Sequence, residues 1–254
     1  MTVRIRSIDY SHDEVQLCGE LAWDDAWEEA RPCVVVVHDA MKSDQGFEEE
    51  RAVALAALGY AVFALDVYGK GVHGTTQEES YALMLPFQED RAHLQRRLRA
   101  GLDAAASQTE VDGGRMAAIG YCFGGLSVLD LARWNAPVAG VVSFHGLLTP
   151  PVLADAERLE GKIEPKVLVC HGWDDPYVPP EMVPAFASEM TERGADWQLF
   201  AMGHVVHSFT NPSYHDREAG VAYDAQANRR SWRILESFLR DLFPGVAASE
   251  KTEK

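Results

Sequence analysis

The sequence lacks any apolar run long enough to span a bilayer, and it is poor in basic residues and in cysteine. Lysine and arginine together number 23, against 39 aspartate and glutamate residues, which gives a formal net charge of -16. Nucleic acids and anionic membrane surfaces would repel so acidic a chain, and we expect neither as a partner. The N-terminus has no apolar segment of the signal-peptide kind, so the sequence predicts a cytoplasmic protein.

The four cysteines are too widely separated to form a recognised metal or redox motif. A disulfide framework is therefore not expected, and neither is a cysteine-based zinc site. Cys18, Cys33 and Cys170 lie in apolar, strand-like segments and are predicted to be unreactive core residues. Cys122 differs from them because it lies in a glycine-rich turn.

No Gly-x-Ser-x-Gly motif occurs in the chain, but residues 120–124 carry its cysteine form, Gly-Tyr-Cys-Phe-Gly. The apolar residues 116–119 before it predict a strand, and a helical pattern follows at once. So tight a turn strains its central residue, and Gly120 and Gly124 let strand and helix approach closely. The helix N-terminus favours a thiolate. We interpret Cys122 as a nucleophile; the alternative is a small buried cysteine in a glycine-rich turn.

The length of 254 residues and the 47% content of hydrophobic residues suit one large domain, predicted over residues 1–246, with a frayed tail at 247–254. Strands and helices alternate, which predicts an α/β fold with a mostly parallel central sheet and helices on both faces. The segment 145–164 is predicted to cover part of a site. The predicted strands are residues 4–10, 16–23, 32–38, 60–65, 116–119, 138–144, 166–170 and 197–200, and the predicted helices are residues 47–58, 88–106, 123–134, 180–193 and 219–242.

An acidic loop follows the strand predicted to end at residue 170. Catalytic groups of a parallel sheet lie at the carboxyl ends of its strands, so this loop is a candidate source of a catalytic acid. Asp174 and Asp175 compete for that role. We predict Asp175, because it stands directly before Pro176 at the point where the loop turns.

A histidine loop follows the strand predicted to end at residue 200. The order nucleophile, acid, histidine is the chain order of the α/β-hydrolase triad. His204 and His207 are both candidates, and we predict His207, which precedes the Ser208-Phe209 turn. A metal site built from the two histidines is an alternative, but the glutamate that accompanies such a pair in zinc proteases is missing. We predict no metal site.

The cysteine turn, the acidic loop and the histidine loop resemble those of the dienelactone hydrolase family, and the resemblance covers residues 31–243. The resemblance implies a single-domain α/β-hydrolase fold whose thiolate opens a lactone or cleaves a small ester through an acyl-enzyme. It also implies that the backbone N–H groups of Phe123 and Ala40 bind the oxyanion. The matching motifs are Gly120-Tyr121-Cys122-Phe123-Gly124-Gly125, Ser143-Phe144-His145-Gly146, Gly172-Trp173-Asp174-Asp175-Pro176, His207-Ser208-Phe209-Thr210-Asn211-Pro212 and Arg229-Arg230-Ser231-Trp232.

Two positions depart from the family pattern. The best-known members carry a glutamate beside the resting thiol where this chain has Asp39, and an arginine for the substrate's carboxylate where it has Asn211. Asp39 is an auxiliary candidate near the thiol; the alternative is a residue that accepts hydrogen bonds from amides of its own loop. The candidate substrate contacts are Tyr68, Lys70 and His145, with a solvated lysine as the alternative for Lys70.

The sequence thus predicts a cysteine-dependent hydrolase of small carboxylic esters or lactones, a carboxymethylenebutenolidase-like enzyme of EC class 3.1.1. Two alternatives stay open: a peptidase or acyl-transfer enzyme on the same fold, and a catalytically silent binding module. We expect no cofactor, a small-molecule ester or lactone as the partner, and a monomer or small homo-oligomer.

Overall fold

The computed structural model describes residues 2–42, 47–151 and 161–246. The chain divides into two compact units, Met1–Ala117 with Leu239–Lys254 in the first and Ala118–Phe238 in the second. We describe each unit by itself. The single domain over residues 1–246 stays a prediction, and the predicted tail at 247–254 lies outside the described residues.

The first unit contains a four-stranded part of the sheet, in the order β1-β2-β4-β3. The two strands predicted over residues 4–10 and 16–23 form a hairpin, because β1 pairs antiparallel with β2 from Val3 opposite Asp24 to His12 opposite Val15. β3 and β4 run parallel. Cys33 and the four valines after it in β3 have no exposed surface, as expected for a β-branched strand covered on both faces. The strands are β1 Val3–His12, β2 Val15–Asp24, β3 Arg31–Val37 and β4 Ala61–Leu65.

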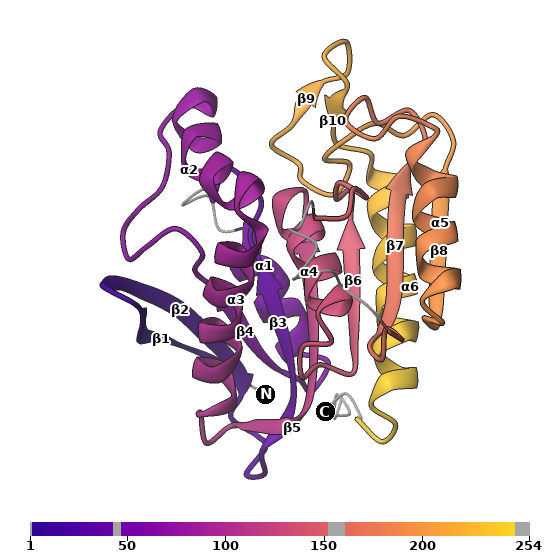
Figure 1. Ribbon diagram of the computed structural model, residues 1–254. Helices are drawn as coiled ribbons and strands as arrows, with labels where there is room; N and C mark the ends of the chain where they lie inside the picture. Colours follow the sequence, from indigo (N-terminus) through magenta and orange to yellow (C-terminus); the bar gives the residue numbers. More distant parts are fainter. Residues whose placement is uncertain (1, 43–46, 152–160, 247–254) are drawn as a thin grey trace. The chain divides into compact units, whose positions relative to one another are not determined.

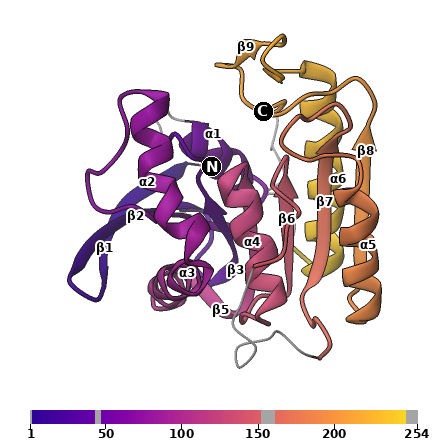
Figure 2. The same cartoon turned by 45° about the horizontal axis from the view of Figure 1, so that its top comes forward.

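Helices α1 (Phe47–Ala56) and α3 (Arg91–Ala106) pack on opposite faces of these strands (Figures 1 and 2). The prediction of a helix from residue 88 was wrong in its start, because the Asp90 carboxylate accepts the N–H of His93 and begins α3 there. The helix before it, α2 (Gln77–Glu89), was not predicted. Its apolar residues form a continuous run over 81–87 that includes Pro86, instead of the spaced pattern from which helices are recognised.

The second unit contains three parallel strands in the order β6-β7-β8. Strand β5 (Val111–Tyr121) leads into this unit, and α4 (Phe123–Arg133) packs on β6 and β7. Helix α5 (Met182–Glu192) contacts β8 through the rings of Phe186 and Trp197. The three strands are β6 Gly140–Phe144, β7 Lys166–Gly172 and β8 Trp197–Met202. Because they are parallel, the loops after them leave from the same edge.

The last helix, α6 (Ala225–Leu242), begins later than predicted. Residues 219–224 are not helical, because β9 (His215–Asp216) and β10 (Val221–Ala222) pair in a small antiparallel sheet. The Asp224 carboxylate then accepts N–H groups of the first helical turn. Of the predicted covering segment 145–164, residues 152–160 lie outside the described part. No helix within the described ranges is long and apolar enough to cross a membrane.

The fold class is the one predicted from the alternation of strands and helices. Each unit contains parallel strands with helices packed against them. This is the arrangement of the α/β-hydrolase fold. Within the second unit, it brings the loops after β5, β6, β7 and β8 into one chemical site.

Candidate active site

Cys122 forms the predicted tight turn between a strand and a helix. It is the one residue between the end of β5 and the start of α4, and its backbone adopts φ 53° and ψ -111°. A positive φ is uncommon for a residue with a side chain and stores strain at functional sites. The Cys122 N–H donates to the Phe144 carbonyl over 3.0 Å, which ties the turn to the end of β6. The thiol is therefore presented at the α4 N-terminus, where backbone N–H groups favour an anion.

Gly120 is required by the close approach of strand to helix, and Gly120→Ala should destabilise the protein. An added Cβ would lie 2.1 Å from the Gly124 carbonyl oxygen, a backbone atom that cannot rotate away. We expect a loss of about 3 kcal/mol of unfolding free energy and a fall in Tm of roughly 6–12 °C, measured by thermal denaturation. The control is Gly203→Ala, because a Cβ there meets nothing within 4 Å. Equal Tm values for the two variants would contradict the packing argument.

His207 and Asp175 form the hydrogen bond predicted from the sequence. His207 Nδ1 lies 2.7 Å from Asp175 Oδ2, and the Asp175 side chain has no exposed surface. Asp175 Oδ1 accepts the Tyr177 N–H, so the loop's own turn orients the carboxylate. The competing pair, His204 and Asp174, is exposed and separated by 3.7 Å. The structure therefore brings together Asp175 and His207, the two residues predicted in preference to Asp174 and His204.

The electrostatics of His207 favour its protonated form. Burial by itself lowers the pKa of His207, but the Cys122 sulfur and the hydrogen-bonded Asp175 carboxylate together outweigh burial and raise the pKa to about 10. The Cys122 side chain is also a hydrogen-bond partner of His207. His207 thus lies between the Asp175 carboxylate and the Cys122 sulfur, an arrangement that a cysteine nucleophile requires.

The other three cysteines have environments that oppose ionisation. Burial raises the pKa of Cys33 and of Cys170 to about 12. Cys18 is partly exposed, and burial together with the neighbouring Asp9 carboxylate raises the pKa of its thiol as well. Cys122 alone combines partial exposure, a helix N-terminus and a basic partner.

The loop after β3, in the first unit, carries the two other residues predicted near the thiol. Asp39 Oδ1 accepts the N–H groups of Met41 and Lys42, over 2.8 and 3.1 Å. The Ala40 carbonyl accepts the Tyr68 hydroxyl over 2.9 Å. These contacts match the alternative in which Asp39 accepts amides of its own loop. Its role beside the thiol, and that of the Ala40 N–H in an oxyanion hole, stay predictions.

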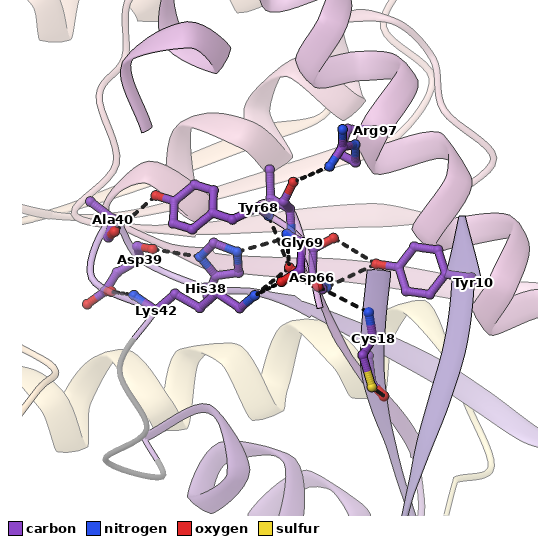
Figure 3. Close-up of polar contacts among 12 residues, drawn as sticks. Tyr10, Cys18, His38, Asp39, Ala40, Lys42, Asp66, Tyr68, Gly69 and Arg97 are labelled. Atoms are coloured by element: carbon purple, nitrogen blue, oxygen red, sulfur yellow. Dashed lines mark hydrogen bonds and ion pairs between the residues drawn. The ribbon is translucent and has the colours of Figure 1, made fainter. Parts of the chain in front are cut away.

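A network that the sequence reasoning missed holds this loop in place (Figure 3). Asp66, buried at the end of β4, accepts the Lys42 ammonium over 2.5 Å and the N–H groups of Tyr68 and Gly69. Its other oxygen accepts the Cys18 N–H. The sequence signal that could have identified Asp66 is its position, directly after a buried strand. The network joins the loop after β3 to the loop after β4.

His38 belongs to the same network and is neutral. Its Nε2 accepts the Val67 N–H over 3.2 Å, so Nδ1 carries the proton and donates to the Asp39 carbonyl over 2.7 Å. Burial, followed by the Lys42 charge, lowers the pKa of His38 to about 4. Burial and the Asp39 carboxylate also raise the pKa of Glu48, at the start of α1, to about 7. The sequence reasoning did not identify Glu48.

The three predicted substrate contacts occupy different environments. Tyr68 is buried, and its hydroxyl is bonded to the Ala40 carbonyl. Lys70 is exposed and pairs with Asp9 over 2.7 Å. His145 is buried, with bonds at both ring nitrogens. Contact with a substrate stays a prediction for all three, and these protein bonds already occupy their polar groups.

The described residues hold no group of three or more His, Cys, Asp or Glu side chains able to bind a metal ion.

A sequence model of the dienelactone hydrolase family matches residues 21–243. A solved structure of a dienelactone hydrolase-like promiscuous phosphotriesterase from metagenomic libraries is 40% identical, with a TM-score of 0.87; the match covers 95% of this chain and 99% of that one. The chain belongs to the dienelactone hydrolase family.

Two further comparisons are consistent with this assignment. An uncharacterized protein of Caenorhabditis elegans is 40% identical over 152 residues, 59% of this chain and 94% of that protein. A structure of a putative dienelactone hydrolase from Klebsiella pneumoniae is 16% identical with a TM-score of 0.76, covering 94% of this chain and 99% of that one, and shows the shared fold. As a dienelactone hydrolase family member, the protein is a hydrolase.

Proposed function

We propose that the protein hydrolyses small carboxylic esters or lactones with Cys122 as the nucleophile, through a thioester acyl-enzyme. The observation that carries the proposal is His207, held between the Asp175 carboxylate and the Cys122 sulfur. This arrangement supplies a thiolate, a proton for the leaving group and a group that orients the imidazole. Catalysis by these residues needs no cofactor. A cytoplasmic monomer or small homo-oligomer remains the prediction.

In the acylation step, the Cys122 thiolate attacks the carbonyl carbon and the carbonyl oxygen becomes an oxyanion. The N–H of Phe123, in the first turn of α4, binds this oxyanion. The Ala40 N–H remains the second donor that the family resemblance implies. The intermediate then collapses, the carbon–oxygen bond of the ester breaks, and the leaving alkoxide takes the proton of the His207 imidazolium. With a lactone, that alcohol remains attached to the acyl group.

In the deacylation step, neutral His207 takes a proton from water as the water oxygen attacks the thioester carbonyl. The thiolate leaves, the carboxylic acid is released, and the thiolate and imidazolium are restored. Asp175 keeps the His207 Nδ1–H directed at itself in both steps, so Nε2 is the nitrogen that exchanges protons.

We propose that neutral, partly aromatic substrates suit the site better than carboxylated ones. Asn211 stands in the position of the family's substrate-binding arginine, and its side-chain oxygen accepts the Ser213 N–H. Trp173 and Tyr177, on the acid loop, are 46% and 42% exposed, and the Tyr177 ring lies 4.8 Å from that of His207. Exposed aromatic surface beside the imidazole favours an apolar leaving or acyl group.

The test is to trap the acyl-enzyme. Rapid acid quenching during turnover of p-nitrophenyl acetate should give a protein one acetyl group heavier, with the label on the Cys122 peptide. The control is the same enzyme alkylated with iodoacetamide beforehand, which should show neither the acetyl adduct nor turnover. A label on another residue would refute the cysteine mechanism, and neither adduct nor turnover with any ester or lactone would favour the binding module. Turnover of peptide amides would favour the peptidase.

Phosphotriester hydrolysis is a second candidate, favoured by the 40% identity to a promiscuous phosphotriesterase. A thiolate able to attack a carbonyl carbon can also attack phosphorus and displace an aryloxide. A p-nitrophenyl phosphotriester therefore belongs in the same assay. Release of p-nitrophenol, with a phosphoryl adduct on Cys122, would support this activity, and no release would exclude that substrate.

A further inference from the structure

His145, at the carboxyl end of β6, bonds to two loops of the second unit. Its Nδ1 lies 3.1 Å from the backbone nitrogen of Cys122, and its Nε2 lies 2.8 Å from the Thr210 hydroxyl. The residue is 2% exposed and has φ 41°, a backbone conformation uncommon for a side-chain-bearing residue. Cys122 is the candidate nucleophile, and Thr210 lies three residues after His207, the candidate catalytic histidine.

We propose that His145 is a positioning residue that ties the backbone of the nucleophile to the loop of the catalytic histidine, as a neutral imidazole protonated at Nε2. The inference rests on the proposed function, in which Cys122 and His207 react together. It assigns to His145 a role different from the substrate contact predicted from the sequence, since both of its ring nitrogens already bond to protein.

The tautomer follows from the partners. The Cys122 N–H is shared between the Phe144 carbonyl and His145 Nδ1. A backbone N–H can only donate, so Nδ1 accepts and does not carry a proton. The ring proton of the neutral form is then on Nε2, which donates to the Thr210 hydroxyl oxygen. A doubly protonated ring would set an Nδ1–H against the Cys122 N–H. The bond to Cys122 therefore requires a neutral His145.

The packing of the ring connects this bond to catalysis. The His145 ring meets the His207 ring edge to face, with centroids 5.0 Å apart, and meets the fully buried Phe209 ring at 5.1 Å. His207 and Thr210 belong to one short loop, so the bond to Thr210 helps set where the imidazole of His207 stands relative to the thiol. Errors of about 1 Å in such positions lower turnover about 100-fold.

The backbone of the histidine loop is held by hydrogen bonds of its own, which do not involve the Thr210 hydroxyl. The His207 N–H donates to the Gly220 carbonyl over 2.9 Å, and the Ala222 N–H donates to the His207 carbonyl over 3.1 Å. Loss of the Thr210 hydroxyl therefore leaves the backbone of His207 attached to β10. What it removes is the hydrogen bond through which His145 connects the histidine loop to the nucleophile turn.

The experiment compares Thr210→Val, which keeps the size of the side chain and removes the hydroxyl, with Thr210→Ser, which keeps the hydroxyl. Thr210→Val should lower kcat for p-nitrophenyl acetate about 10- to 100-fold with KM within about twofold. Thr210→Ser should recover most of kcat. Equal kcat values for Thr210→Val and wild type would overturn the proposal, as would a loss in Thr210→Ser as large as that in Thr210→Val.

A second measurement does not depend on turnover. Long-range ¹H–¹⁵N spectra of the wild-type imidazoles should show His145 as the neutral Nε2–H tautomer between pH 6 and 8. Thr210→Val should change the ¹⁵N shift of Nε2, which loses its acceptor, and keep the tautomer, because the Cys122 N–H still faces Nδ1. A wild-type His145 that is charged or protonated at Nδ1 would refute the inference. If the wild type hydrolyses no ester, the proposed function fails, and the tautomer still decides the role of His145.

Discussion

Replacing Asp175 with asparagine should lower kcat for ester hydrolysis about 10³- to 10⁴-fold, by analogy with serine triads. The amide cannot stabilise an imidazolium, and its N–H₂ group can donate to His207 Nδ1 and force the ring proton onto Nε2. That proton would then face Cys122 in the neutral ring, so the histidine could not act as a base toward water. Asp175 is fully buried and bonds His207 over 2.7 Å, which makes the loss large.

The matched control is Asp174→Asn, one residue earlier in the same loop. The Asp174 side chain is 44% exposed, and its partner His204 is 95% exposed and 3.7 Å away. Exposed pairs of this kind contribute little, so kcat should stay within about twofold of wild type. Steady-state kinetics of the two variants on one ester checks both values. If Asp174→Asn were the damaging change, the acid would be misassigned by one residue.

Removing the thiol should have an effect at least as large. Cys122→Ala should lower kcat by a factor on the order of 10⁴ or more, because it removes both the attacking atom and the covalent intermediate. It should also abolish the fast reaction of the protein with iodoacetamide. The reason is that Cys33 and Cys170 are buried and their thiol pKa values are raised to about 12, so little of either is ionised or accessible at neutral pH.

Cys18→Ala is the control, because Cys18 is the other partly exposed cysteine and lies outside the proposed machinery. This variant should keep wild-type kcat and the fast alkylation, followed by peptide mapping after brief labelling. Ester hydrolysis that survives in Cys122→Ala would exclude the cysteine mechanism. Rapid labelling of wild-type Cys18 in preference to Cys122 would contradict the assignment of the reactive thiol.

Local features of the sequence predicted the nucleophile turn and much of the fold. Gly120, Cys122 and Gly124 lie within five residues, so the strand, the turn and the helix could be recognised without any tertiary contact. The buried strands β3 and β4 were recognised from continuous apolar runs. Helix α2 was missed because its apolar residues run consecutively over 81–87 and include Pro86, although the Thr76 side chain that accepts the Glu79 N–H marks its start.

Tertiary structure decided what local pattern leaves open. Asp174 and Asp175 are adjacent and chemically alike, and only the folded loop directs one toward His207 and the other toward solvent. The bonds from His145 to Cys122 and Thr210 join residues 23 and 65 positions apart. The sequence by itself determined which groups stand at strand ends. Which of them meet depended on the directions of single side chains, because hydrogen bonds form only at short range and in narrow geometry.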